Sequence, residues 1–260
     1  MRFSLRGVLA TAFVLVMCGV CVRLGFWQLD RLQQRRARNH VQAQALRMPT
    51  LAYDSMTAEA IERDPAPFLN RKLRVTGAYD PAGEVVLRGR ADDGRPGVHL
   101  VTPLVVPGVP RALLVNRGWV PSPDAATVDA RPWAEPGPRT VEGILMEIPR
   151  GTKHGGEPAA QRSPGGPSTP SYRRLDLDVL RRVERRPIVR LYLQQLPGAD
   201  SAGRPPVRVP LQPMTNGPHL SYAFQWFSFA AIGLVGLVVV YLRRGREKTG
   251  DVGIRPSPEA

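Results

Sequence analysis

Two long apolar segments, one near each end of the chain, constrain this protein more than any other feature. Residues 222–242 contain no charged side chain. As an α-helix they would be about 30 Å long, which is the thickness of the hydrocarbon core of a bilayer. In residues 7–29 the only charged side chain is Arg23, and an arginine near the end of a span can extend its guanidinium group to the lipid headgroups. The sequence therefore predicts two transmembrane helices with a domain between them.

The first apolar segment also has features of a signal peptide, because a short basic stretch, residues 1–6, precedes it. Signal peptidase needs small residues after the apolar core, but Arg23, Phe26 and Trp27 occupy that place. We therefore expect an uncleaved anchor, and a cleaved signal is the alternative. No amphipathic transit sequence rich in arginine and serine precedes the anchor, so we expect a bacterial cell membrane rather than a mitochondrion.

The distribution of basic residues predicts the orientation of the two helices, because Lys and Arg gather on the cytoplasmic side of a membrane. Residues 243–248 carry four of them, and residues 214–219, before the second apolar segment, carry none. The first segment indicates the opposite orientation, since two arginines precede it and four follow it. We give more weight to the stronger contrast. We expect residues 1–6 and the basic tail 243–260 in the cytoplasm, with the middle domain outside.

The net charge of +14 raises the question of nucleic acid as a partner. Much of the excess is arginine beside the apolar segments, and the sequence has no zinc-finger spacing, RNA-recognition motif or stripe of basic and aromatic residues. Basic residues in these places suit anionic lipid headgroups. We expect contact with the lipid bilayer and no binding of nucleic acid.

Cys18 and Cys21 are the only cysteines, and on a helix they lie on one face. This C-x-x-C spacing could hold copper or form a redox pair. The two residues lie deep inside the first apolar segment, however, where no positive charge stabilises a thiolate. We expect them to act as small apolar residues, and we expect the domain outside to be stable without a disulfide bond.

From about His40 the chain changes from helical to strand-like periodicity. Turns that contain Gly, Pro and Asp separate six expected strands, at residues 72–80, 84–90, 98–106, 111–120, 140–148 and 187–196. Two short helices are expected at residues 57–64 and 177–186, and either Asp176 or Asp178 would cap the second one.

These elements define one extracytoplasmic domain, residues 30–215. Within it, residues 150–170 are rich in Gly, Pro and Ser and predict a flexible insertion. Residues 216–221 would lie at the outer membrane interface. The expected fold class is a membrane protein in which two transmembrane α-helices flank a mainly antiparallel β (α+β) domain.

The outer ends of the apolar segments carry residues that could bind a cofactor. His219, Tyr222 and Trp226 follow an i, i+3, i+7 pattern and form one stripe on a helix, with a gap at the small Ala223. A flat ligand such as haem could lie there, with Nε2 of His219 on the iron and an arginine such as Arg31 beside a propionate. The alternative is that these residues only anchor the helix at the headgroups, as Trp and Tyr do in membrane proteins generally.

The other three histidines are weaker candidates for a second ligand. His40 lies about ten residues beyond the end of the first apolar segment, which makes it a weak candidate. His99 falls in an expected strand, where a half-buried structural histidine is usual. His154 falls in the insertion, and we expect no role for it.

Residues 115–121, VNRGWVP, are unusual for the middle of a strand. Asn116 and Gly118 suit a bulge or a tight turn, which would make this stretch a structural corner. Arg117 and Trp119 offer a charge and an aromatic surface, so contact with a partner or a ligand is the alternative.

No enzyme signature accompanies these stretches. The sequence has no G-x-S-x-G, H-E-x-x-H, Walker loop or glycine-rich dinucleotide turn, and its carboxylates are scattered. We expect no catalytic activity. A membrane-anchored enzyme would require a buried cluster of titratable groups in the middle domain.

Three stretches in order resemble the surfeit-locus family of cytochrome c oxidase assembly factors. They are LGFWQLDR at the end of the first apolar segment, LLVNRGWVP in the middle domain and HLSYAFQWFSFA at the start of the second segment. The stretches VTGAYD, GVHLVTPL and VEGIL are also similar to the family's strand motifs, so the resemblance covers about residues 24–242. The insertion and the C-G-V-C pair depart from the family pattern.

The resemblance implies a non-enzymatic role in building haem-copper oxidases, at the stage when haem a enters the catalytic subunit. His219 stands where the family has a histidine implicated in haem binding. Trp119 matches the tryptophan of the family's N-R-G-W motif, and Trp27 and Gln28 match its motif at the end of the first span. We expect partner contacts at these three residues and at Arg117, and the implied partners are the catalytic subunit and other assembly factors. The alternative is a scaffold that docks onto oxidase subunits and stabilises them without binding haem.

Overall fold

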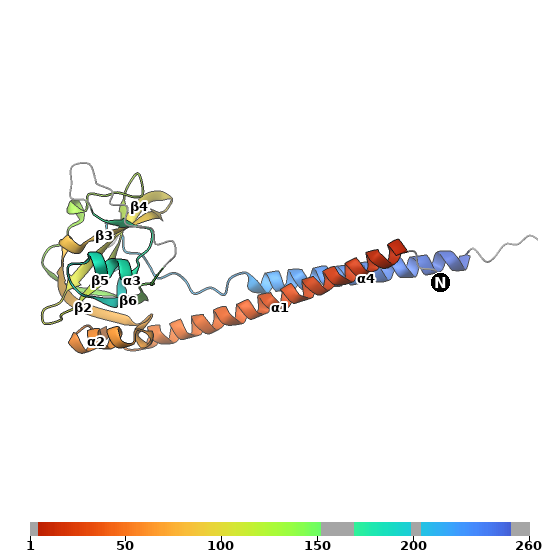
Figure 1. Ribbon diagram of the computed structural model, residues 1–260, viewed down its shortest axis with the longest axis horizontal. Coiled ribbons are helices and arrows are strands. Elements are labelled where there is room, and N and C mark those ends of the chain that lie inside the picture. Colours follow the sequence, from red (N-terminus) through yellow and green to blue (C-terminus); the bar gives the residue numbers. More distant parts are fainter. Residues whose placement is uncertain (1–4, 152–168, 199–203, 251–260) are drawn as a thin grey trace, which may run out of the picture. The chain divides into compact units, whose positions relative to one another are not determined.

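The computed structural model describes three stretches of chain, residues 5–151, 169–198 and 204–250. Most of the expected insertion at 150–170 therefore lies outside the described residues. The chain divides into two compact units (Figure 1). One unit, Met1–His40 with Met214–Ala260, contains the paired parts of the two long helices, and the other, Val41–Pro213, contains the β-sheet.

Helix α1 (Leu5–Arg47) contains the first apolar segment but continues well beyond residue 29. Residues 30–47, which we assigned to the β-rich domain, are thus helical. They contain no Gly or Pro, and most of them are good helix formers such as Gln, Arg, Ala and Leu. The helix ends shortly before Pro49, since a proline disfavours helical backbone in the residue that precedes it. Hydropathy marks the apolar part of this helix and not its end.

Helix α4 (His219–Gly250) begins at the histidine of the expected site. Both α1 and residues His219–Arg243 of α4 are long and apolar enough to cross a membrane. The two helices lie side by side and run antiparallel (Figure 1). The hydroxyl groups of Thr11 and Tyr241 are 2.8 Å apart in this pair.

Small residues allow α1 and α4 to approach each other closely. The ring of Phe227 packs on Gly25, where a Cβ atom would lie 2.6 Å from the ring. Cys18 and Cys21 are buried in the same interface, and the thiol of Cys18 donates to the carbonyl oxygen of Ala230 at 3.5 Å. Both cysteines are free thiols and pack as small apolar residues do, which matches the expectation.

The second unit contains one mixed sheet, and all six expected strands are present in it. They are β2 (Lys72–Tyr79), β3 (Val85–Asp92), β4 (Arg95–Val105), β5 (Ala112–Pro121), β6 (Pro138–Glu147) and β8 (Ile188–Gln195). Two further strands, β1 (Leu51–Ala52) and β7 (Ser171–Tyr172), are too short to show periodicity in the sequence. The described part of the unit also contains three short 3₁₀ helices, namely η1 (Ala66–Phe68), η2 (Pro81–Gly83) and η3 (Arg131–Trp133).

Five of the strands close into a ring, which makes this unit barrel-like. The neighbours around the ring are β2, β6, β8, β5 and β4, and β4 pairs again with β2. Most pairs are antiparallel, as expected, but β5 and β8 are parallel, and so are the outer pairs β1–β2 and β3–β7. A parallel pair needs a crossover connection, and helix α3 (Leu177–Val183) lies in the connection that leads to β8.

The two short helices lie where the sequence predicts them. Asp54 caps α2 (Ser55–Arg63), because its side chain accepts from the backbone N–H of Thr57 at 2.7 Å. Asp176 caps α3 in the same way and accepts from the backbone N–H groups of Asp178 and Val179. Of the two candidate caps for α3, Asp176 is therefore the one used.

Strand β5 is buried on both faces. Leu113 and Val115 belong to one apolar core, which α2 covers, and Ala112 and Leu114 belong to a second core, which α3 covers. A strand with two buried faces has a continuous apolar run in place of alternation, and this explains the run at the start of β5. The same strand carries Arg117 into the interior of the domain.

Candidate functional site

The histidine at the start of α4 contacts a glutamine at the end of the first apolar segment. Nδ1 of His219 lies 3.0 Å from Oε1 of Gln28 on α1, and both side chains are half-buried. Because an amide oxygen only accepts hydrogen bonds, Nδ1 carries the hydrogen in this pair and donates it. The bond leaves a free lone pair on Nε2 of His219, which is the arrangement of a metal-binding imidazole.

The aromatic residues near this pair differ in their exposure. Tyr222 is 47% exposed and Trp27 is 43% exposed, so both present ring surface outside the helix pair. Trp226 is half-buried against the cluster of Cys18 and its neighbours. Ala223, where we expected a gap for a flat ligand, is only 1% exposed, so the stripe has no opening at that position. The packing of two helices closes the gap that one helix alone would leave.

Arg31, the expected partner of a propionate, lies one turn beyond Trp27 on α1. Its guanidinium carbon is 5.5 Å from the centre of the Trp27 ring, and Nη1 donates to Oε1 of Gln34 at 3.3 Å. No carboxylate among the described residues pairs with Arg31. Its charge therefore remains available to an anionic group.

The chain that enters α4 is fixed to α1 by two polar side chains. Nε of Arg35 donates to the carbonyl oxygen of Thr215 at 3.2 Å. Nδ2 of Asn39 donates to the same oxygen at 3.1 Å and to Oδ1 of Asn216 at 3.3 Å. These bonds orient the segment immediately before His219, and the bond to Gln28 orients the histidine side chain itself.

Neither His40 nor His99, the remaining histidines that the structure describes, provides a second ligand. His40 is exposed on α1, and His154 lies outside the described residues. His99 contacts Asn116 at 3.3 Å, and burial lowers its pKa to about 4, so it is a neutral structural residue as expected. In the described part of the chain, no three His, Cys, Asp or Glu side chains are placed to hold a metal ion. Haem ligation at this site would rest on His219.

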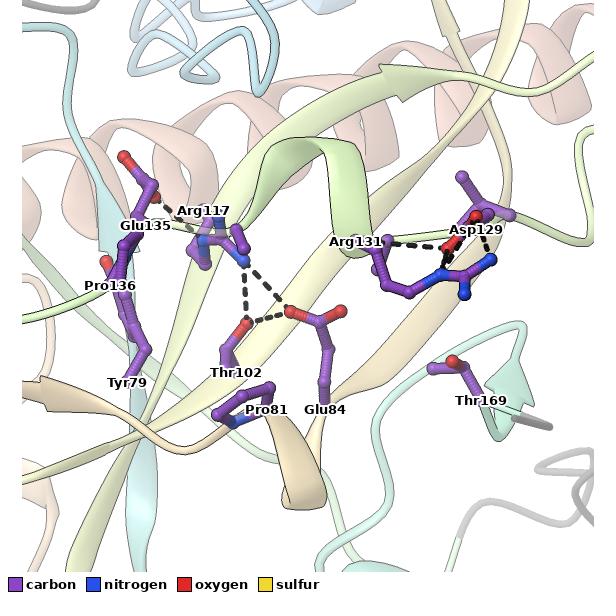
Figure 2. A pocket seen from close by; sticks show the side chains of 13 residues that line it. Tyr79, Pro81, Glu84, Thr102, Arg117, Asp129, Arg131, Glu135, Pro136 and Thr169 are labelled. Carbon is purple, nitrogen blue, oxygen red and sulfur yellow. Dashed lines mark hydrogen bonds and ion pairs between the residues drawn. The ribbon is translucent and has the colours of Figure 1, made fainter. Parts of the chain in front are cut away.

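A second candidate site is a cluster of charged residues inside the β unit (Figure 2). Arg117, which is 2% exposed, donates from Nη1 to Oε2 of Glu84 at 2.9 Å and from Nε to Oε2 of Glu135 at 2.9 Å. Nη2 of Arg117 donates to the carbonyl oxygen of Trp133. Oε2 of Glu84 also accepts from the hydroxyl group of Thr102 at 2.6 Å. Each of the three guanidinium nitrogens of Arg117 therefore has an acceptor.

Glu135 joins further arginines to the cluster. Its Oε1 accepts from Nη1 of Arg139 at 2.9 Å and from Nη2 of Arg208 at 2.6 Å. The guanidinium carbon of Arg117 also lies 4.9 Å from the centre of the Tyr79 ring. Buried charges are tolerated only when they are paired and hydrogen-bonded. Every charge of this cluster has a partner of opposite charge, while Nε of Arg139 and Nε of Arg208 have no hydrogen-bond partner among the described residues.

Burial and the arginines act in opposite directions on the acids of the cluster. Burial raises the pKa of Glu84 by more than its hydrogen bonds and Arg117 lower it. Burial also acts to raise the pKa of Glu135, but Arg208 and Arg117 outweigh it, so that this pKa is lowered. Burial, and after it Glu135, raises the pKa of Tyr79 to about 12. Glu84 is therefore the carboxyl group of the cluster that holds a proton more readily.

The N-R-G-W stretch forms a buried corner that binds residues 204–213, which we call the return segment. Gly118 has a φ of +114°, and a Cβ atom there would lie 2.1 Å from the carbonyl oxygen of Val207. Nη1 of Arg208 donates to the carbonyl oxygen of Arg117 at 2.5 Å. The corner expected from the sequence is thus present, and only glycine allows the return segment to approach it so closely.

Arg117 and Trp119, where we expected partner contacts, are 2% and 3% exposed and contact their own chain. Sequence reasoning did not identify Glu84, Glu135 and Arg208. No local motif marks these residues, because each of them meets Arg117 only through the fold. The one available signal was the presence of an arginine within an otherwise apolar strand, since a buried arginine requires acidic partners.

The cluster also bears on the possibility of an enzyme, which would need buried titratable groups of this kind. Its one contact between a hydroxyl group and a carboxylate joins Thr102 to Oε2 of Glu84. The same oxygen accepts from Arg117, and that charge weakens it as a base. The pairing is that of a structural ion cluster.

The chain thus combines a barrel-like β domain with two helices that are long enough to cross a membrane. The model of the SURF1 family matches residues 15–231, which is most of the chain. The protein therefore belongs to the SURF1 family.

Individual relatives agree with this assignment. A SURF1-like protein of Monosiga brevicollis is 27% identical over 245 residues, which cover 87% of this chain and 85% of the relative. A SURF1-like protein of Rickettsia felis is 30% identical over 108 residues, with 41% of this chain and 44% of the relative covered. A SURF1-like protein of Rickettsia bellii is 30% identical over 112 residues, with 41% of each chain covered.

Proposed function

We propose that this chain is a non-enzymatic assembly factor for haem-copper cytochrome c oxidase, which binds or presents haem a for insertion into the catalytic subunit. The observation that carries the proposal is the hydrogen bond from Nδ1 of His219 to Oε1 of Gln28. It orients the imidazole ring and leaves Nε2 free to act as a ligand. Membership of the SURF1 family supports the assembly role.

The residues around His219 suit a haem in their chemistry. His219 would ligate the iron, Tyr222 and Trp226 would offer ring surface on the same helix, and Arg31 would pair with a propionate. The bound group would supply the iron porphyrin that the oxidase needs. The residues of this chain bind and orient it, and none of them has to make or break a covalent bond.

We also propose that α1 and α4 span the cell membrane as a multi-pass anchor with both termini in the cytoplasm. The basic residues after the second apolar segment support this orientation. Gln28 and His219 would then lie at the outer face, beside the lipid headgroups.

Trp27 and Gln28 would meet the oxidase catalytic subunit or another assembly factor there. Arg117 and Trp119 are buried, so they would act on a partner indirectly, by holding the residues above them on the surface of the β unit in place.

A scaffold that binds oxidase subunits without haem is the second candidate. The observation that favours it is the exposure of Phe26, Trp27 and Phe224 at the outer end of the helix pair. These side chains could pack against the helices of an oxidase subunit. Such packing would require no ligand on His219.

One experiment separates the two candidates. The full-length protein is purified in detergent from cells that make their native haems, as the wild type, as His219→Ala and as His40→Ala. His40 is an exposed histidine on the same helix pair and serves as the matched control. The absorption spectrum and the amount of copurified oxidase subunit are recorded for each sample.

A haem carrier predicts a Soret band in the wild type and in His40→Ala that is lost or shifted in His219→Ala. A haem-independent scaffold predicts equal copurification of the oxidase subunit in all three samples, whatever the spectrum. A colourless wild type, or equal haem in His219→Ala, would contradict the haem proposal.

A further inference from the structure

A pocket of about 300 Å³ lies beside the buried ion cluster of the β unit (Figure 2). Its apolar walls are formed by Tyr79, Pro81, Val128, Ala130, Ala134 and Pro136. A volume of this size is sufficient for a small organic molecule. The pocket belongs to a different unit from His219, so the proposed haem site does not account for it.

One carboxylate oxygen of a largely buried residue lines this pocket without a partner among the described residues. Oε2 of Glu84 accepts from Thr102 and Arg117, whereas Oε1 has no hydrogen bond to any residue that the structure describes. Figure 2 shows Oε1 turned away from Arg117, toward the side on which Arg131 and Thr169 lie. The side chain of Glu84 is only 7% exposed, and Glu84 lines the pocket. A molecule that reaches Oε1 must therefore enter the pocket.

The arginines that line the pocket are already paired. Arg117 donates from each of its three nitrogens to acceptors in the chain. Arg131 donates from Nε and Nη2 to the two carboxylate oxygens of Asp129, at 2.8 and 2.7 Å. An anion in the pocket would therefore meet the carboxylate of Glu84 without an unpaired guanidinium group among the described lining residues. An apolar molecule without a donor would leave Oε1 unsatisfied, which is also unfavourable.

We propose that this pocket binds a small, mostly apolar molecule that donates one hydrogen bond, from a hydroxyl group or a protonated amine, to Oε1 of Glu84. The apolar walls hold the body of the ligand, and the carboxylate oxygen selects its polar end. Ligands that end in a carboxylate or a phosphate are rejected by like charge. This site is independent of His219 and of haem, so each proposal can fail without the other.

Three probes of nearly equal size test the selection directly. They are 2-phenylethanol, 2-phenylethylamine and phenylacetate, which share one ring and differ in the polar end. Each is titrated into the full-length protein in detergent, and saturation-transfer NMR gives the dissociation constant, with empty micelles as the blank. We expect the alcohol and the amine to bind at least about tenfold more tightly than phenylacetate, which is the effect of one hydrogen bond to a charged group.

Two variants at one exposed wall residue test the location. Ala134→Phe places a ring at the pocket and leaves the ion cluster intact, whereas Ala134→Ser keeps the pocket open. We expect Ala134→Phe to abolish binding of the alcohol and the amine, and we expect Ala134→Ser to keep it. Glu84→Gln turns the acceptor into an amide and should remove the discrimination against phenylacetate, in a sample whose fold is confirmed by circular dichroism.

Three results would overturn the proposal. They are equal binding of phenylacetate and the other two probes to the wild type, binding of no probe above the micelle blank, and unchanged binding to Ala134→Phe. The first and second use the wild-type protein, so they remain decisive if a variant fails to fold.

Discussion

Trp119 and Val207 exchange two backbone hydrogen bonds, from Trp119 N to Val207 O at 2.8 Å and from Val207 N to Trp119 O at 2.7 Å. This bridge joins the buried corner of β5 to the return segment that leads toward α4. The N-R-G-W stretch thus has a structural task that its sequence alone does not reveal. Its arginine pairs the buried acids, its glycine admits the return segment, and its tryptophan binds that segment through the backbone.

Gly118→Ala tests this task. The new methyl group would collide with the carbonyl oxygen of Val207, and the φ of +114° is unfavourable for alanine. We expect a loss of about 2–4 kcal/mol, which lowers the Tm of the β unit by roughly 5 °C or more. Gly108→Ala is the control, because Gly108 also has a positive φ (+76°) but faces open space. A Gly118→Ala variant as stable as Gly108→Ala would show that the bridge is dispensable.

Arg117→Met leaves the buried Glu84 without its arginine partner and removes one of the three arginines that pair with Glu135. We expect the free energy of unfolding to fall by about 3–5 kcal/mol, as for other broken buried ion pairs. Denaturant unfolding followed by tryptophan fluorescence would measure the loss.

Arg74→Met is the matched control for this change. Arg74 pairs with Glu142 on the surface, where both side chains are more than half exposed, so its loss should cost at most about 1 kcal/mol. The double variant Arg117→Met with Glu84→Gln should recover part of the stability that Arg117→Met loses, because it removes the charge of Glu84, whereas Glu135 keeps Arg139 and Arg208 as partners. Equal losses for Arg117→Met and Arg74→Met would refute the structural role of the cluster.

Gln28→Leu removes the acceptor of His219 Nδ1. If His219 ligates haem, we expect haem affinity to fall by about 10-fold or more, because the imidazole loses its orientation. Gln28→Glu supplies a stronger acceptor and should keep or raise the affinity. Haem titration monitored at the Soret band gives the dissociation constants. Gln33→Leu, at an exposed position of α1, controls for the loss of an amide side chain. If Gln33→Leu lowers the haem affinity as much as Gln28→Leu does, the role of the Gln28–His219 hydrogen bond is contradicted.

Glu184 predicts a pH dependence of stability. Burial, and after it Asp80, raises its pKa from 4.5 to about 7. The folded state therefore binds this proton more tightly than the unfolded chain does. The resulting stability is fully present below about pH 4.5 and is lost as the pH rises through about 7. Because the group is partly exposed, we expect the loss between about pH 5 and pH 8 to be about 1–2 kcal/mol.

Glu184→Gln should lack this loss, since its amide does not titrate in that range. Denaturant unfolding at the two pH values measures the difference between the variant and the wild type. Glu59→Gln, at an exposed position of α2, should keep the wild-type dependence. If Glu184→Gln and the wild type lose stability equally, the pH dependence has another origin.

Much of the fold could be predicted from the sequence, because its signals are local. Alternation and turns located the six long strands, and Asp176 and Asp178 were the two candidates for the cap of α3, of which the structure uses Asp176. The two-residue strands β1 and β7 have no periodicity to detect, and the closure of the ring depends on residues far apart in the chain. The length of α1 was underestimated because hydropathy, and not helix propensity, set the expected end.

The candidate site could be predicted only in part, for the same reason. His219 was identified from its place before an apolar run, and its contact with Gln28 spans 191 residues of sequence. The partners of Arg117 lie 33, 18 and 91 residues away, at Glu84, Glu135 and Arg208. Contacts of this separation follow from the packing of the chain and leave no local pattern.

The ring of strands is joined unevenly. Between β2 and β4, in the described chain, only Ala78 with Val105 and Tyr79 with Leu104 are paired, whereas the other joins are longer. A join with so few ladder hydrogen bonds opens at a lower free energy than the rest of the ring. We therefore expect β2 and β4 to separate before the rest of the barrel unfolds. The amide hydrogens of the β2–β4 join should be the first in the ring to exchange with deuterium.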